Sequence, residues 1–234
     1  MKVLHLLKAP DFVSLINLLF GIIAIFLSFS GAYGAAAACL LVAAAADGVD
    51  GYVARKTSSG PLGSHLDSLI DAVSFGVAPA VIVYCMSESL LASVSGFVYA
   101  ACGILRLARY NAFPTKNPVY SGIPITGGAV FIALAIILNL NLERTGFVSA
   151  YAAEILILFI FVLSVLMIST IPYSKVMKKG TFMLLIVLFV GTIASVFLEN
   201  TGVILFPLAL SVLMLIYLMS PLVGLIRKKE GIEI

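Results

Sequence analysis

Long apolar stretches alternate with short polar joints along the whole chain. Each stretch is close to the ~20 residues that a membrane-spanning helix requires. The predicted helices cover residues 12–30, 35–55, 62–86, 90–110, 126–142, 147–171, 181–198 and 202–225. The pattern therefore predicts an all-α, polytopic integral membrane protein with about eight transmembrane helices, and the length of 234 residues predicts a single domain.

Composition supports a membrane protein. Hydrophobic residues make up 62% of the chain and charged residues only 11%, whereas soluble domains carry about 25% charged residues. The net charge of +3 is small, and nothing in it indicates a nucleic-acid partner, so we expect none. We expect the lipid bilayer to be the main surroundings of the protein.

The basic residues predict the orientation. Thirteen of the 14 lysines and arginines fall on one side of an eight-helix topology, and only Arg144 falls on the other. Positive charge marks the cytoplasmic side of a membrane protein. We therefore expect a protein of the cytoplasmic membrane with both termini, and the end of the second helix that carries aspartates, facing the cytoplasm. The thirteen are Lys2, Lys8, Arg55, Lys56, Arg106, Arg109, Lys116, Lys175, Lys178, Lys179, Arg227, Lys228 and Lys229.

Four of the five aspartates are concentrated in two neighbouring predicted helices: Asp47, Asp50, Asp67 and Asp71. One aspartate at the centre of a bilayer costs roughly 2.5–3.5 kcal/mol on insertion scales. Residues three or four apart share a helical face, so each pair lies on one face of its helix. The short joint between the helices predicts antiparallel neighbours whose four carboxylates meet near the cytoplasmic side.

Carboxylate clusters of this kind bind hard divalent cations such as Mg²⁺, Mn²⁺ or Ca²⁺. Four carboxylates exceed what one Mg²⁺ takes from a protein, so a two-metal site of the kind that serves phosphoryl chemistry is expected. Alanines at 35–38 and 43–46 predict close packing of the second helix against the third. Gly51 and Gly63 suggest close approach of a ligand, and Arg55 suits its phosphate. The alternative is a carboxylate–arginine network that only holds helices together.

The aspartates belong to the pattern D-x2-D-G-x2-A-R-x7-G-x3-D-x3-D, which resembles the signature of the CDP-alcohol phosphotransferases. All eight fixed positions are present: Asp47, Asp50, Gly51, Ala54, Arg55, Gly63, Asp67 and Asp71. The resemblance implies a six-helix core, here residues 12–171, with helices at 181–225 as additions. It also implies a homodimer, a polar cavity open to the cytoplasm and two divalent cations, Mg²⁺ or Mn²⁺, held by the four aspartates.

Four further segments resemble membrane-bound phosphatidylserine synthases: DAVSFGVAPA from Asp71, RLARYN from Arg106, YSGIP from Tyr120 and STIPY from Ser169. This resemblance implies a CDP-diacylglycerol-type lipid, ester- or ether-linked, and L-serine as substrates. Asp71 is then the expected general base. Arg106 and Arg109 are either cationic anchors at the cytoplasmic side or a clamp for the acceptor.

The first helix opens with a segment that resembles the family's P-N-x-x-T-x-x-N-x-x-x-G pattern, with Asp11 and Ser14 as replacements that keep capping side chains. Ser14 and Asn17 are either interhelical hydrogen-bonding groups or, as the resemblance implies, part of the nucleotide pocket. Thr57 either reaches a nucleotide phosphate or belongs only to the joint. The CDP-lipid-binding residues are thus expected to be Ser14, Asn17, Gly51, Ala54, Arg55, Thr57 and Gly63.

Two other functions compete with transfer to serine. The first is the same reaction with another acceptor, such as glycerol phosphate or inositol phosphate, which calls for more cationic groups in the cavity. The second is cation transport through the four aspartates. Transporters often carry inverted repeats, and we find no internal repeat in this chain.

Overall fold

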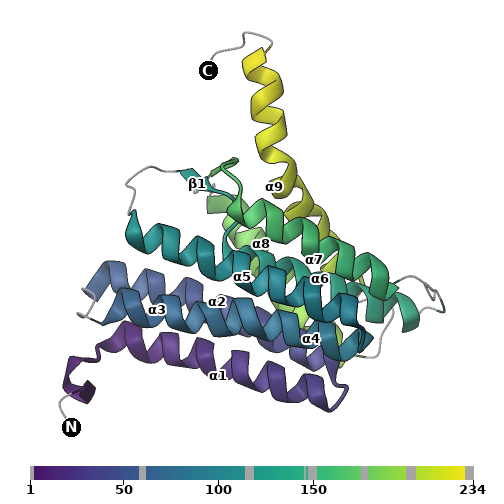
Figure 1. Ribbon diagram of the computed structural model, residues 1–234, viewed down its shortest axis with the longest axis horizontal. Helices are drawn as coiled ribbons and strands as arrows, with labels where there is room; N and C mark the ends of the chain where they lie inside the picture. The colour runs from purple at the N-terminus through teal and green to yellow at the C-terminus, as the bar shows by residue number, and fades with distance from the viewer. Residues whose placement is uncertain are drawn as a thin grey trace.

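The computed structural model describes residues 3–57, 62–113, 119–144, 146, 152–174, 179–198 and 204–229. Within these ranges the side chains at 3–4, 55, 57, 119–120, 174, 179–183 and 222–229 are not described. Figure 1 shows helices lying side by side in a bundle, with the end of the last helix extending away from it. Over the described residues the chain makes eight helical passes, in agreement with the predicted number.

A short 3₁₀ helix, η1 (Val3–Leu6), precedes the bundle. The passes are α1 (Ala9–Phe29), α2 (Tyr33–Thr57), α3 to α4 (Gly63–Ser87), α5 (Leu90–Ala112), α6 (Ile125–Arg144), α7 (Ala152–Ile168), α8 (Lys179–Phe197) and α9 (Leu205–Lys229). Most predicted bounds lie within a few residues of these. The predicted 147–171 is longer than α7, and residues 147–151 are not described.

The third pass is not one regular helix. It consists of α3 (Gly63–Asp71), a π-helical segment η2 (Ala72–Val77) and α4 (Ala78–Ser87). Short π-helical segments are rare and are frequently found at functional sites. Here η2 begins directly after Asp71, a feature that the apolar pattern of this segment does not predict.

Small residues bring α1 close to this segment. A Cβ atom added to Gly21 of α1 would lie 2.8 Å from the Cα atom of Ser74 in η2, so only glycine permits the approach. The Ser74 hydroxyl is fully buried and donates to the backbone carbonyl of Asn17, 3.3 Å away. The close contact therefore ties α1 to the residues that follow Asp71.

The alanines of α2 pack only partly as predicted. Ala36, Ala37, Ala38 and Ala43 are buried, but α2 packs mainly along α1 and then along α6, with little contact to α3. Helix α2 contacts the third pass at η2 and α4, and Asp47 of α2 lies close to Asp67 and Asp71 of α3. Helix α1 contacts both α2 and α3 and holds them as neighbours.

A two-stranded antiparallel ribbon joins the α5–α6 and α7–α8 connections, which the sequence analysis treated as plain polar joints. Strand β1 (Val119–Ser121) pairs with β2 (Pro172–Ser174), with Tyr120 opposite Tyr173. Tyr173 is 1% exposed, stacks on Tyr217 of α9 at 5.5 Å between ring centroids and donates its hydroxyl to the carbonyl of Leu218. The ribbon thus connects α9 to the core.

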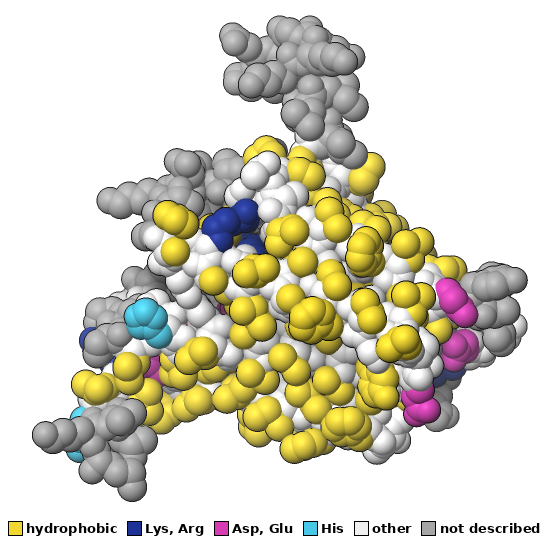
Figure 2. Space-filling view, viewed as in Figure 1, with side chains coloured by type: hydrophobic (Ala, Val, Ile, Leu, Met, Phe, Trp, Pro, Cys, Tyr) yellow, Lys and Arg dark blue, Asp and Glu magenta, His cyan; other side chains and the backbone are white. Residues whose placement is uncertain are grey.

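The bundle has the surface of a membrane protein. Figure 2 shows hydrophobic side chains over the flank and acidic side chains gathered at one end. Among the residues that the structure describes, five segments are long and apolar enough to span a membrane (α1, Tyr33–Ala54, Gly63–Ser87, α5 and α6), and three shorter apolar helices follow at Ala152–Ile168, Leu184–Phe197 and Leu205–Pro221. The prediction of an all-α polytopic membrane protein is confirmed, with the ribbon as a small addition.

Candidate active site

Three of the four predicted carboxylates converge. Asp47 of α2 and Asp67 and Asp71 of α3 each offer an oxygen atom, and these atoms lie within 4.8 Å of one another. Asp50 is not part of this group. Its side chain is 6% exposed and accepts a hydrogen bond from Ser14 of α1, and its binding of a cation stays a prediction.

The convergence requires a counter-charge. Two unit charges about 4 Å apart repel by about 4 kcal/mol at the effective dielectric constant of a protein surface. Asp67 Oδ1 is also buried without a hydrogen-bond partner among the described residues. A buried acceptor left unsatisfied costs about 1–3 kcal/mol or more. A cluster of oxygen ligands with an open acceptor fits a hard divalent cation.

Each of the other three aspartates receives a hydrogen bond from a different residue. Ser14 Oγ donates to Asp50 Oδ2 at 2.8 Å, and Asn17 Nδ2 donates to Asp71 Oδ1 at 3.2 Å. Both donors lie on the buried face of α1. The third donor, Thr126 Oγ1 at the start of α6, lies 3.1 Å from Asp47 Oδ2.

Asp11 and Ser14, which the sequence analysis both treated as capping residues of α1, form different contacts in the structure. Asp11 accepts the backbone N–H of Lys8 at 2.7 Å and so caps the helix as predicted. Ser14 lies more than one turn inside α1 and donates to Asp50 and to the carbonyl of Pro10. Its predicted role as a capping side chain is wrong. The alternative of interhelical hydrogen bonding is confirmed for both Ser14 and Asn17.

Replacing Asn17 by leucine removes the donor to Asp71 and keeps the branched shape of the side chain. A hydrogen bond to a charged group is worth about 1.5–3 kcal/mol, so kcat is expected to fall about ten- to a hundred-fold. The KM for the CDP-lipid is expected to change little, because the lost contact acts on Asp71. Steady-state kinetics in detergent measure both parameters.

Asn141→Leu is the matched control. Asn141 is also buried, on α6, and its amide donates to the carbonyl of Ile137 in the same helix. It should retain wild-type kcat. A raised KM for the CDP-lipid with unchanged kcat in Asn17→Leu would instead indicate direct contact with the nucleotide.

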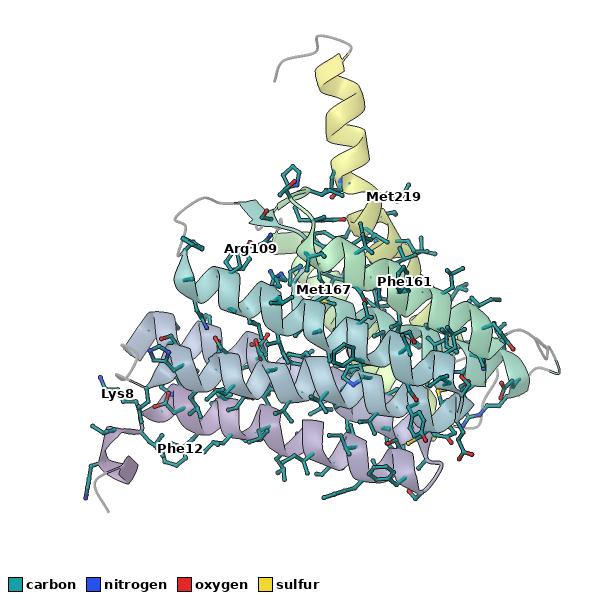
Figure 3. The ribbon with its side chains drawn as sticks, viewed as in Figure 1. Lys8, Phe12, Arg109, Phe161, Met167 and Met219 are labelled. Carbon is teal, nitrogen blue, oxygen red and sulfur yellow. The ribbon has the colours of Figure 1, made fainter. Side chains whose placement is uncertain are left out.

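The two candidate acceptor arginines have different surroundings. Arg109 donates to the carbonyls of Ser121 at 2.6 Å and of Ile168 at 3.3 Å. Figure 3 shows it at the end of α5, beside the ribbon. Arg106 is 6% exposed, and its guanidinium carbon lies 4.7 Å from the centre of the Tyr110 ring. Arg109 therefore links α5 to the ribbon and to the end of α7, and acceptor binding by either arginine stays a prediction.

The remaining predicted ligand residues lie around the same end of the bundle. Gly51 and Ala54 on α2 and Gly63 at the start of α3 are partly exposed. Their contact with a CDP-lipid stays a prediction. The side chains of Arg55 and Thr57 lie outside the described residues.

Several contacts at this end were missed by the sequence analysis. Thr126 and Ser74 were not singled out, although both contact the site or its supports. Ser68, next to Asp67, exchanges hydrogen bonds with Asn111 of α5. A threonine directly after the apolar Gly-Ile-Pro-Ile run was the available signal for Thr126, but nothing local indicates that it reaches α2.

Comparison with known proteins agrees with this geometry. Residues 7–163 match the model of the CDP-alcohol phosphatidyltransferase family. An archaetidylserine synthase from Methanothermobacter thermautotrophicus is 35% identical over 184 residues, 76% of this chain and 75% of that protein. A CDP-diacylglycerol–serine O-phosphatidyltransferase from Methanocaldococcus jannaschii is 40% identical over 129 residues, 54% of this chain and 59% of that protein.

A CDP-diacylglycerol–serine O-phosphatidyltransferase from Helicobacter pylori is 32% identical over 226 residues, which is 93% of this chain and 90% of that protein. The region matched by the family model contains all four motif aspartates and both Arg106 and Arg109. The chain belongs to the CDP-alcohol phosphatidyltransferase family.

Proposed function

We propose that this protein transfers the phosphatidyl or archaetidyl group of a CDP-activated diradylglycerol to the hydroxyl of L-serine and releases CMP. The convergence of Asp47, Asp67 and Asp71 within the family motif carries this proposal. The relatives above, all named for serine transfer or archaetidylserine synthesis, support serine as the acceptor. The resemblance of the RLARYN and YSGIP segments supports it independently.

The carboxylates have distinct functions in this proposal. Asp47, Asp50, Asp67 and Asp71 hold two divalent cations, Mg²⁺ or Mn²⁺, which neutralise the diphosphate of the CDP-lipid when bound. Asp67 contributes Oδ1, which is buried without a hydrogen-bond partner in the described part of the chain. Ser14, Asn17 and Thr126 keep the other carboxylates oriented through their hydrogen bonds.

Asp71 is the proposed general base. It takes the proton of the serine hydroxyl, whose oxygen then forms a bond to the lipid-side phosphorus as the bond from that phosphorus to CMP breaks. Asn17 holds one oxygen of Asp71, which leaves the other directed at the substrate. Fixed orientation of the two reacting groups supplies much of the rate enhancement in such a site.

The charge of Arg106 binds the carboxylate of serine in this proposal. Arginine binds a carboxylate through two parallel N–H donors, and the burial of Arg106 strengthens this attraction. A phosphate-bearing acceptor carries more charge and calls for additional cations. Arg109, the nearest candidate, already donates to two backbone carbonyls.

We further propose the arrangement in the cell. Glu88 and Glu143 are exposed and lie at the turns after α4 and at the end of α6, beside Arg144, whereas Arg106 and Arg109 lie near the end of α5, on the side where the ribbon lies. By the positive-inside rule, both termini and the site face the cytoplasm. Lys116, Lys175 and Lys178 lie outside the described residues.

The whole chain is one catalytic domain in this proposal, with a family core at residues 12–171 and α8 and α9 as additions. The family match ending at residue 163 supports the division. The resemblance also supports a homodimer, which the mass of the purified protein in native mass spectrometry tests.

A direct assay tests the proposed reaction. Purified protein in detergent is supplied with Mn²⁺ or Mg²⁺, an ester- or ether-linked CDP-lipid and labelled serine, and CMP and labelled lipid are measured. We expect CMP release that depends on serine, together with a serine lipid. CMP release only with glycerol phosphate or an inositol would overturn the acceptor, and no CMP release with any acceptor would overturn the reaction.

A further inference from the structure

The hydroxyl of Thr126 forms a hydrogen bond between two helices, α6 and α2. Most hydroxyl groups inside the described helices donate to a carbonyl of their own helix, as Ser164 does to Ile160 and Thr192 to Leu188. Thr126 is the second residue of α6, and the residue four positions earlier, Gly122, lies outside the helix. Its Oγ1 instead donates to Asp47 Oδ2 of α2 at 3.1 Å.

The start of α6 is held in place by contacts that do not involve Asp47. The backbone N–H groups of Gly122 and Ile123 donate to the carbonyls of Ile171 and Leu166 at 2.9 and 3.2 Å. Arg109 donates to the carbonyl of Ser121 at 2.6 Å. These bonds tie the segment before α6 to α5, to α7 and to the residues just beyond α7.

Ile125 anchors the same turn inside the bundle. Its side chain is 1% exposed and fills the space left by two glycines. Its Cδ1 atom lies 2.6 Å from the position that a Cβ atom would take on Gly103 of α5 and 3.6 Å from that position on Gly76 of η2. The first turn of α6 thus contacts the π-helical segment that follows Asp71, and its position is independent of the bond to Asp47.

We infer that Thr126 is a positioning residue for Asp47. Its hydroxyl donates to Oδ2 and so fixes the orientation of the carboxylate that Asp47 contributes to the group formed with Asp67 and Asp71. Donors of this kind orient the carboxylates that bind metals, and their loss typically lowers metal affinity ten- to a hundred-fold. The inference rests on the proposed cation site and adds to it a residue from outside the family motif.

Binding of Mn²⁺ alone tests this without turnover. The affinity of the purified protein in detergent is measured by isothermal titration calorimetry for wild type, Thr126→Val, Thr126→Ser and Asp47→Asn. Valine keeps the branched shape and lacks the hydroxyl, whereas serine retains it. Thr192→Val is the matched control, because the hydroxyl of this buried threonine of α8 donates to the carbonyl of Leu188 in its own helix.

We expect Thr126→Val to weaken Mn²⁺ binding about ten-fold or more, with Thr126→Ser and Thr192→Val close to wild type. If Thr126→Val and Thr126→Ser weaken Mn²⁺ binding equally, the inference is overturned. It is also overturned if Asp47→Asn weakens Mn²⁺ binding and Thr126→Val does not, and in both cases the cation site itself remains supported. If even Asp47→Asn leaves Mn²⁺ binding unchanged, the cation site itself is wrong and the inference falls with it. Should the valine variant not fold, Thr126→Ala replaces it in the same comparison.

Discussion

Asp71→Asn is expected to abolish turnover while the protein still binds the CDP-lipid. The amide keeps the size of the carboxyl group, and its oxygen still accepts the hydrogen bond that Asn17 donates to Asp71 Oδ1. It cannot take a proton from serine. Loss of a general base alone lowers a rate by about 10²–10⁴-fold. A neutral amide also binds a divalent cation more weakly than a carboxylate, which lowers the rate further. CMP release and equilibrium binding of a CDP-lipid measure the two effects separately.

Asp11→Asn is the matched control for this change. Asp11 is as buried as Asp71 but lies at the start of α1, where it accepts the N–H of Lys8. An asparagine there keeps a capping acceptor and should retain turnover. Equal loss of CDP-lipid binding and turnover in Asp71→Asn would contradict its assignment as the base and make it chiefly a cation ligand.

Gly122→Ala is expected to destabilise the end of the bundle that holds the candidate site and to reduce activity without changing a site residue. Gly122 has a φ of +76°, which costs about 1–2 kcal/mol for any other L-residue. A Cβ atom there would also overlap the carbonyl of Met167 and lie 2.8 Å from that of Leu166. The backbone must shift, and such overpacking typically costs a further 1–3 kcal/mol.

Gly31→Ala separates these two contributions. Gly31 has a φ of +74°, but no atom lies within 4 Å of the added Cβ. It should therefore show only the backbone cost and keep full activity. Thermal unfolding in detergent and CMP release are measured for both variants. Equal unfolding temperatures would contradict the close contact between Gly122 and the end of α7.

The fold was predictable where it depends on local properties of the chain. The length and apolarity of each segment are enough to predict the eight helices, because a spanning helix must satisfy its backbone groups internally and present apolar side chains to lipid. The ribbon between β1 and β2 was not predictable. Its strands are three residues each and lie more than fifty residues apart, so no periodicity marks them.

In the candidate site, too, local spacing predicted some features, and contacts between distant helices decided others. The motif spacing predicted that Asp67 and Asp71 share a face of α3 and that Asp47 approaches them, and these three converge. It also predicted Asp50 as a fourth cation ligand, which stays a prediction, and the structure adds that Asp50 accepts a hydrogen bond from Ser14 of α1. Spacing on one helix states which side chains share a face, whereas the neighbouring helix decides what that face meets.

Sequence alone was sufficient for the membrane class, for the number of passes and for the acidic motif that identifies the family, since each follows from residues close together in the chain. The tertiary structure decided which carboxylates cluster and which donors orient them. Thr126 reaches Asp47 from 79 positions away, and Arg109 donates to the carbonyls of Ser121 in β1 and Ile168 at the end of α7. Contacts of this kind depend on how distant helices and strands pack against one another, so no local sequence pattern predicts them.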